Sequence, residues 1–376
     1  MECLNCPDLI NEWRSYFCFL YNRQWHNYIW LYSRASTSMS SSKKLLQSAS
    51  GFLNSAVADP PDIGDVFSTH TYTGTNANNN VQVNGIDLLN EGGLVWIKGR
   101  NYSGNHRWVD TERGDRKLLT SNNTDGELTD QGATYGLSFN NNGFTVRQEY
   151  NGDMNASQTY VSWSFRKSKR FFDVIKYTGN GTAGRTISHN AGTPGFIIVK
   201  RIDNNGEPWY CYHRSLGATK YLRLNGDQAA TTSDEPWNNT EPTSSEVTLA
   251  QYNSANGNGG QYIMYVFAHD TDDDGVIQCG NLTISSQAST NVALGFEPQW
   301  ILLKHSSSTS YWWLFDTQRG MTSSSFKWVY PNASDAEETK TYQGVFPISN
   351  GFTFNPANNG QFTDGDYVYI AIRKET

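Results

Sequence analysis

The run Leu94-Val95-Trp96-Ile97-Lys98, in which four apolar residues precede a lysine, determines how the rest of the chain is understood. The pattern recurs at 196–200 as FIIVK and at 300–304 as WILLK. A segment that returns at a fixed period is the signature of an architecture built from copies of one unit. The three runs therefore predict an internal triplication.

A turn motif follows each of the three lysines at nearly constant distance. It reads DTERG at 110–114 and DTQRG at 316–320, beginning 12 residues after the lysine in both cases. In the middle of the chain it begins 13 residues after the lysine and reads HRSLG at 213–217. An aromatic segment that predicts a strand precedes each turn.

A strand-like segment closes each unit. The segments are YVSWSF at 160–165, YIMYVF at 262–267 and YVYIAI at 367–372, and they end 67, 67 and 68 residues after the lysine. The alternation of Val161, Trp163 and Phe165 with two serines predicts a strand with one buried and one solvated face. This spacing predicts three repeats, at 66–169, 170–270 and 271–376.

The composition favours β structure. Aromatic residues make up 14% of the chain and charged residues only 17%, and there are 33 glycines. Polarity comes from turn-forming Asn, Ser, Thr and Gly more than from helix formers. We therefore predict an all-β protein of three tandem antiparallel β-sandwich (jelly-roll-like) repeats of about 100 residues each. The sequence is compatible with two arrangements of the repeats: one after another along the chain, or packed around a pseudo-threefold axis.

The N-terminal region differs from the rest. Residues 1–38 carry three of the five cysteines, including a CxxC at 3–6, but no second pair at metal-binding spacing. We interpret them as a doubtful leader and Met39 as the true start. Residues 39–65 contain apolar positions at helical spacing before Pro60, which predicts a short helix or arm. This helix would pack on the first repeat or dock the chain onto a larger assembly.

The charge balance excludes some classes of function. A formal net charge of −7 argues against nucleic-acid binding, which needs a basic face. No apolar run approaches the length of a membrane span. Neither nucleic acid nor membrane is therefore expected as a partner.

The repeated turn has two interpretations. Asp110 and Glu112 could supply the paired carboxylates of a glycoside hydrolase. However, Gln318 and His213 replace them in the other repeats. We favour a structural turn in which the aspartate caps backbone N–H groups, the arginine pairs with it and the glycine takes a positive φ. The residues of this structural turn are Asp110, Arg113 and Gly114, and Asp316, Arg319 and Gly320, and no catalytic residue is assigned.

One segment resembles a calcium-binding loop. Asp270, Asp272 and Asp274 stand at positions 1, 3 and 5, and Gly275 stands at position 6. Position 12 is Asn281 rather than a bidentate glutamate. A solvated acidic linker between the second and third repeats is the alternative, and calcium is the one cofactor that stays open.

Exposed aromatic side chains could stack on sugar rings. The candidates are Trp209, Trp237, Trp312 and Trp313, with packing in the sandwich core as the alternative. Adjacent Trp312 and Trp313 cannot both point inward on a two-faced strand. One of them is therefore predicted to be exposed or to lie between repeats.

The motifs together resemble a known family. The stretches GGLVWIK at 92–98, DTERG at 110–114, YTGNGTAG at 177–184 and TKYL at 219–222 are similar to the triplicated β-domain (LamG-like or concanavalin-like) virion proteins of marine and cyanobacterial tailed phages. The start MSSSKKLL at 39–46 is similar as well, so the likeness covers about 39–376. The third repeat departs from it, with Cys-Gly-Asn at 279–281 in place of Tyr-Thr-Gly.

The resemblance implies a place in a phage particle. The expectation is a non-enzymatic virion structural protein, either a tail or fibre appendage or a decoration of the capsid surface. Other virion proteins would be its partners, and a homo-oligomer stays open. A glycan-binding module that recognises a host-surface receptor is the alternative, and a glycan-degrading enzyme is a third hypothesis.

Overall fold

The computed structural model describes residues 17–20, 28–31, 59–129, 136–147, 153–322, 325–341, 344–356 and 361–375. The chain divides into two compact units, Met1–Val57 and Ala58–Thr376. In the first unit, β1 (Phe17–Leu20) pairs with β2 (Tyr28–Leu31) in antiparallel register. The helix predicted ahead of Pro60 lies almost wholly outside the described residues.

The second unit is all-β, with several antiparallel sheets. Its helices in the described part of the chain each span four residues: α2 (Ile63–Val66), α3 (Leu88–Glu91) and α4 (Asn253–Asn256). Asp62 caps α2 and Asp87 caps α3, each by accepting a hydrogen bond from a backbone N–H of its helix. Among the described residues, no helix is long and apolar enough to cross a membrane.

Three six-stranded sheets share one strand order. Large sheet 1 contains, in spatial order, β3 (Phe67–Thr73), β11 (Thr159–Arg166), β5 (Gly93–Gly99), β6 (His106–Asp110), β7 (Lys117–Thr120) and β8 (Leu128–Thr129). Large sheet 2 contains β12 (Phe172–Thr178), β19 (Gln261–Ala268), β14 (Pro194–Arg201), β15 (Trp209–His213), β16 (Lys220–Arg223) and β17 (Thr231–Thr232). Large sheet 3 contains β20 (Ile277–Ile284), β28 (Gly365–Arg373), β22 (Pro298–His305), β23 (Trp312–Asp316), β24 (Ser325–Val329) and β25 (Glu338–Thr341).

A smaller sheet accompanies each large one. Small sheet 1 is β4 (Asn80–Val83), β10 (Gly143–Val146) and β9 (Leu137–Asn140). Small sheet 2 is β13 (Arg185–Ser188) and β18 (Glu246–Leu249). Small sheet 3 is β21 (Thr290–Ala293), β27 (Gly351–Asn355) and β26 (Gly344–Ile348). We call each pair of a large and a small sheet a module; all strands of a module come from one of the three predicted stretches.

The strand register also recurs. The closing strand of each module pairs with the strand that carries the Lys-terminated run. The partners of the three lysines are Val161 for Lys98, Ile263 for Lys200 and Val368 for Lys304.

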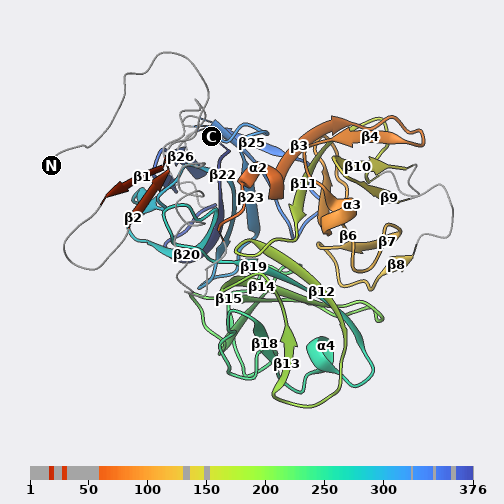
Figure 1. Cartoon of the computed structure of the whole chain (residues 1–376). Coiled ribbons are helices and arrows are strands. Elements are labelled where there is room, and N and C mark those ends of the chain that lie inside the picture. Colours follow the sequence, from red (N-terminus) through yellow and green to blue (C-terminus); the bar gives the residue numbers. More distant parts are fainter. Residues whose placement is uncertain are drawn as a thin grey trace. The chain divides into compact units, whose positions relative to one another are not determined.

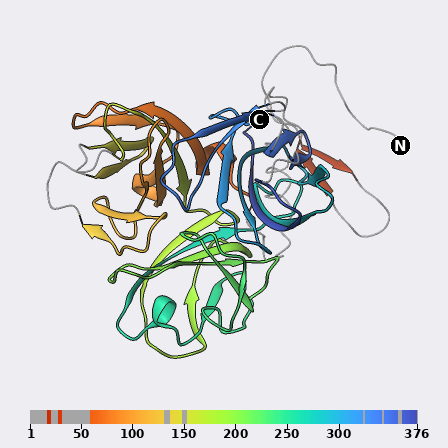
Figure 2. The ribbon, with the colours of Figure 1, turned by 180° about the vertical axis from the view of Figure 1, so that it is seen from behind.

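Both faces of each large sheet are buried. One face packs on the small sheet of the same module and forms a separate apolar core. The other faces contribute to a single common core that contains residues of all three modules. Figures 1 and 2 show the three large sheets meeting in the middle of the second unit, with β4, β13 and other small-sheet strands farther out.

The prediction that one face of the closing strand of module 1 is solvated is wrong. Ser162 and Ser164 are fully buried, as are the apolar residues Val161, Trp163 and Phe165 that alternate with them. The Ser162 hydroxyl donates to the carbonyl of His70, and the Ser164 hydroxyl accepts a hydrogen bond from Asn84. Small polar residues satisfied in this way fit the inner side of a module, because a buried hydroxyl with a partner carries little penalty.

Phe165 lies where the three modules meet. Its ring centroid is 5.4 Å from that of Phe267 in module 2 and 5.8 Å from that of Trp300 in module 3. Phe165→Ala should therefore lower the free energy of unfolding by about 3–5 kcal/mol, because it opens a cavity in the common core. Equilibrium urea unfolding of the full chain measures this. Leu89→Ala, at a side chain that is 63% exposed, is the control; a loss below about 1 kcal/mol at Phe165 would contradict the common core.

Candidate functional site

Backbone hydrogen bonds join the three modules in a closed cycle. In each case the donor is a backbone N–H just before the last strand of one large sheet. The acceptor is a carbonyl of another module, just after the strand that carries its Lys-terminated run, and the N···O distance is 2.7–2.8 Å. Module 1 donates to module 2, module 2 to module 3, and module 3 back to module 1. The pairs are Glu127 to Ile202, Ala230 to Ser306, and Glu337 to Arg100.

The repeated lysines occupy these junctions. Each is fully buried, and its Nζ donates to one carbonyl of its own module and to one carbonyl in a loop of a neighbouring module. The bonds between modules are Lys98 to Ser334 (3.2 Å), Lys200 to Thr124 (3.2 Å) and Lys304 to Asp227 (3.1 Å). Burial lowers the pKa of Lys98 and Lys200 to about 8 and that of Lys304 to about 7.

The turn motif has the contacts that its structural interpretation describes. The Asp110 carboxylate accepts from the backbone N–H of Arg113 at 3.0 Å and from its Nε at 2.6 Å. The guanidinium also donates to the carbonyl of Trp108, and Gly114 has φ 103°. Asp316, Arg319 and Gly320 repeat this geometry, with a corresponding ion pair of 2.6 Å and φ 107°.

The turns are themselves bonded across module boundaries. The Tyr265 hydroxyl of module 2 donates to Asp110 Oδ2 at 2.8 Å. The Trp163 indole of module 1 donates to Asp316 Oδ2 at 3.0 Å. In module 2 the turn begins with His213, whose Nε2 lies 3.1 Å from the carbonyl oxygen of Tyr369 in module 3. A second closed cycle of contacts thus runs through the turn motif.

In two modules the turn arginine joins the turn aspartate to a glutamate that lies just before the last strand of the large sheet. Arg113 lies between Asp110 and Glu127, with Nη1 3.6 Å from the Glu127 carboxylate. In module 3, Arg319 lies in the same way between Asp316 and Glu337. Module 2 has His213, Leu216 and Ala230 at the matching positions, and the last two pack against the common core. Module 2 therefore differs from modules 1 and 3 at all three of these positions.

The candidate glycosidase pair does not form a catalytic site. Asp110 is fully buried and bonded to Arg113 and Tyr265. Glu112 lies at the surface and pairs with Lys167 at 2.8 Å. One carboxylate is enclosed and the other is solvated, so the two do not flank a common open space as glycoside hydrolysis requires.

All four tryptophans proposed for sugar stacking are buried, none more than 1% exposed. Trp312 belongs to the common core, and its indole donates to the carbonyl of Arg223 in module 2 at 2.9 Å. Trp313 belongs to the separate core of module 3, and Trp237 belongs to that of module 2. Trp209 donates to the carbonyl of Asn123 in module 1. In this structure none of the four side chains is exposed to stack on a sugar ring, and Trp312 lies between repeats, as one of the two predicted alternatives.

The proposed calcium loop holds an arginine. The Arg170 guanidinium contacts Asp270 and Asp272 at 2.7 Å and Asp274 at 3.5 Å. A single cation from module 2 thus already contacts all three carboxylates. Among the residues that the structure describes, no group of His, Cys, Asp and Glu is arranged to hold a metal ion. The assignment of calcium ligands to Asp270, Asp272 and Asp274 is corrected accordingly.

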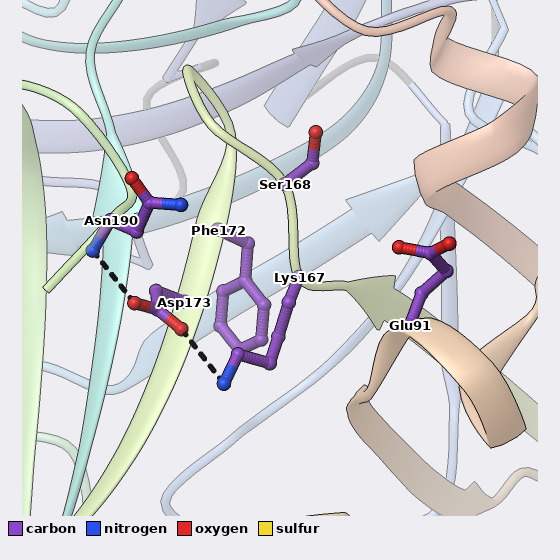
Figure 3. Close-up of a pocket in the computed structure, with 6 residues that line it drawn as sticks. All are labelled: Glu91, Lys167, Ser168, Phe172, Asp173 and Asn190. Atoms are coloured by element: carbon purple, nitrogen blue, oxygen red, sulfur yellow. Dashed lines mark hydrogen bonds and ion pairs between the residues drawn. The ribbon is translucent and has the colours of Figure 1, made fainter.

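A small open cleft lies where module 1 passes into module 2. It has a volume of about 300 Å³ and is lined by Glu91, Lys167, Ser168, Phe172, Asp173 and Asn190. Figure 3 shows the Asp173 carboxylate between the Lys167 ammonium and the backbone N–H of Asn190, at 3.3 and 2.7 Å. The Asp173 carboxylate is thus already paired with groups that line the same cleft.

The buried lysines predict a pH dependence of stability. Their pKa lies near 7–8 in the folded chain and near 10.5 when unfolded, so the unfolded chain binds more protons from pH 7 to 8.5. The free energy of unfolding should rise with pH in this window, by up to about 1.4 kcal/mol per pH unit for each lysine. Lys304→Met should reduce that slope by about 1 kcal/mol per pH unit.

Urea unfolding at several pH values between 7 and 8.5 measures the slope. Lys169→Met, at an exposed side chain, is the matched control and should leave the slope unchanged. An equal slope in Lys304→Met and the original chain would contradict the inferred burial of a titrating lysine.

The aspartate loop predicts indifference to calcium. Because Arg170 already pairs with the three carboxylates, millimolar Ca²⁺ should leave Tm within about 1 °C of its value in EDTA. Differential scanning fluorimetry of the full chain measures this, with Mg²⁺ as the control ion. A calcium-specific rise of several degrees would restore the metal site.

Comparison with known proteins places the chain in a family. Comparison with curated proteins finds no similar sequence. A family model described as a domain of unknown function, DUF7483, matches residues 62–375. The match covers all three modules and begins just before α2. The chain therefore belongs to the DUF7483 family.

Proposed function

We propose that this chain is a non-enzymatic structural protein of a phage particle, either a tail or fibre appendage or a decoration of the capsid surface. One observation carries the proposal. The recurring polar side chains that sequence motifs single out, the lysines and the turn aspartates, are buried at module junctions and bonded there. A residue consumed in such contacts holds the assembly together and is not free to act on a substrate.

The type of junction supports a structural role. Charged side chains buried in low dielectric are costly unless they are paired or hydrogen-bonded, and here each is satisfied by a neighbouring module. If one module were separated from the other two, these groups would lose the hydrogen bonds that the neighbouring modules supply. We call the three modules, joined by these closed cycles of hydrogen bonds, the ring. The ring is therefore expected to behave as one rigid body, a property suited to a particle component under mechanical load.

The likeness of the motifs at 92–98, 110–114 and 177–184 to phage virion proteins supplies the remainder of the proposal. On this proposal the location is the virion, and the partners are other virion proteins. The glycan-binding alternative is not supported by its four candidate tryptophans, because all four are buried in the cores.

Purified particles test the proposed function. Proteomic mass spectrometry of density-purified particles of the phage that encodes this chain should detect the protein in fixed stoichiometry to the major capsid protein. Labelling with an antibody against the chain, followed by electron microscopy, should mark one location on the particle. A protein found only in the host lysate and never in the particle would overturn the proposal.

A further inference from the structure

We propose that edge strand β4 (Asn80–Val83) pairs with β4 of a second copy of the chain, so that small sheet 1 continues across a two-fold axis. This inference goes beyond the proposed function and does not depend on it. It commits to a second copy as the occupant of that edge.

The observation behind it is an inverted polarity in β4. Val81 and Val83 point outward and are 56% and 60% exposed, whereas Gln82 points inward and is 6% exposed. Gln82 is satisfied by its own surroundings, because its side chain bonds those of His70 and Asn80. The apolar residues thus face solvent, the reverse of what a solvated strand face normally presents.

The other two modules give an internal comparison. Strands β13 and β21 show the same order of buried and exposed positions as β4. Where β4 exposes two valines, β13 exposes Thr186 and Ser188, and β21 exposes Asn291 and Ala293. The inverted pattern is therefore particular to module 1 and is not a requirement of the fold.

The position of β4 leaves it open to pairing. It is the end strand of small sheet 1, and among the described strands it pairs only with β10. Figure 1 shows β4 at the outer rim of module 1. The strand carries no charge and no proline, which are the usual devices that block edge-to-edge pairing.

Self-complementarity identifies the occupant. The stretch Asn80-Val81-Gln82-Val83-Asn84 reads the same in both directions. In an antiparallel pair centred on Gln82, Val81 of each copy lies opposite Val83 of the other, and Asn80 lies opposite Asn84. A two-fold axis needs such a self-complementary patch, and here it would join four valines on one outer face.

The oligomeric state of the full chain tests the proposal. Because a short strand buries less area than a standard interface, dimers should form at tens of micromolar and dissociate below about 1 µM. In sedimentation velocity, the double variant Val81→Thr with Val83→Ser, which copies β13, should weaken dimerisation at least tenfold. Leu89→Ser, at another exposed apolar side chain of module 1, is the matched control and should leave it unchanged.

Cysteine cross-linking tests the register. With Cys3, Cys6 and Cys18 changed to serine, a mixture of Val81→Cys and Val83→Cys chains should oxidise to the 81–83 disulfide at least tenfold more than either chain alone. Directly opposed residues come within disulfide distance, and those displaced by two positions do not.

Three results would overturn the proposal. These are a monomer at 100 µM, a dimer that the double variant leaves intact, and equal cross-linking in single and mixed samples. A monomer whose Val83→Cys thiol resists alkylation would instead assign the edge to another segment of the same chain.

Discussion

The structure depends on the burial of both faces of each large sheet. One face can be covered within the module by its small sheet, but the other is covered only by the remaining two modules. A single module on its own would expose tryptophan and phenylalanine side chains such as Trp96 and Phe165 to water. The hydrophobic gain of closing the ring is thus shared by all three modules, and the buried lysines and backbone bonds fix the geometry in which it is realised.

The junction chemistry is the same in outline three times but not identical. Modules 1 and 3 have an aspartate and an arginine in the turn and a glutamate before the last strand of the large sheet, where module 2 has His213, Leu216 and Ala230. This difference follows the rule that a buried charge needs its whole set of partners. Replacement of the arginine alone would remove the ion-pair partner of a fully buried aspartate, Asp110 or Asp316, so an apolar turn needs the aspartate and the arginine replaced together.

Sequence alone could predict the strands, their antiparallel type and the period of the motifs, because spacing and periodicity are local properties. The turns at Asp110 and Asp316 were also predictable, since the contacts between the aspartate and the arginine of each turn lie within three positions. The sequence could not show whether the three repeats follow one another without closing or form a closed ring. The packing around an axis depends on contacts with the carbonyls of Thr124, Asp227 and Ser334. Every residue type has a backbone carbonyl, so the sequence does not show which carbonyls take part. It likewise missed Arg170 as the partner of Asp270, which lies 100 positions away.

The adjacent residues Trp312 and Trp313 also show what a strand pattern can and cannot predict. The strand pattern at Trp312 and Trp313 required one ring on each face, and this was correct as geometry. Of the two predicted alternatives, exposure or a place between repeats, the second describes Trp312, while Trp313 packs in the separate core of module 3. Ser162 and Ser164 misled for the opposite reason, because small hydroxyl residues look solvated until their partners His70 and Asn84 are known.

Closure of the ring between the first and third modules is the central claim, and a disulfide across that junction tests it most directly. Ser103 Oγ and Ser334 Oγ lie 3.1 Å apart although 231 positions separate them in the chain. Ser103→Cys with Ser334→Cys, in the chain without its N-terminal cysteines, should form an intramolecular disulfide under mild oxidation, seen as a linked peptide pair in mass spectrometry. Free thiols, or links only between different molecules, would show that the modules form an open chain.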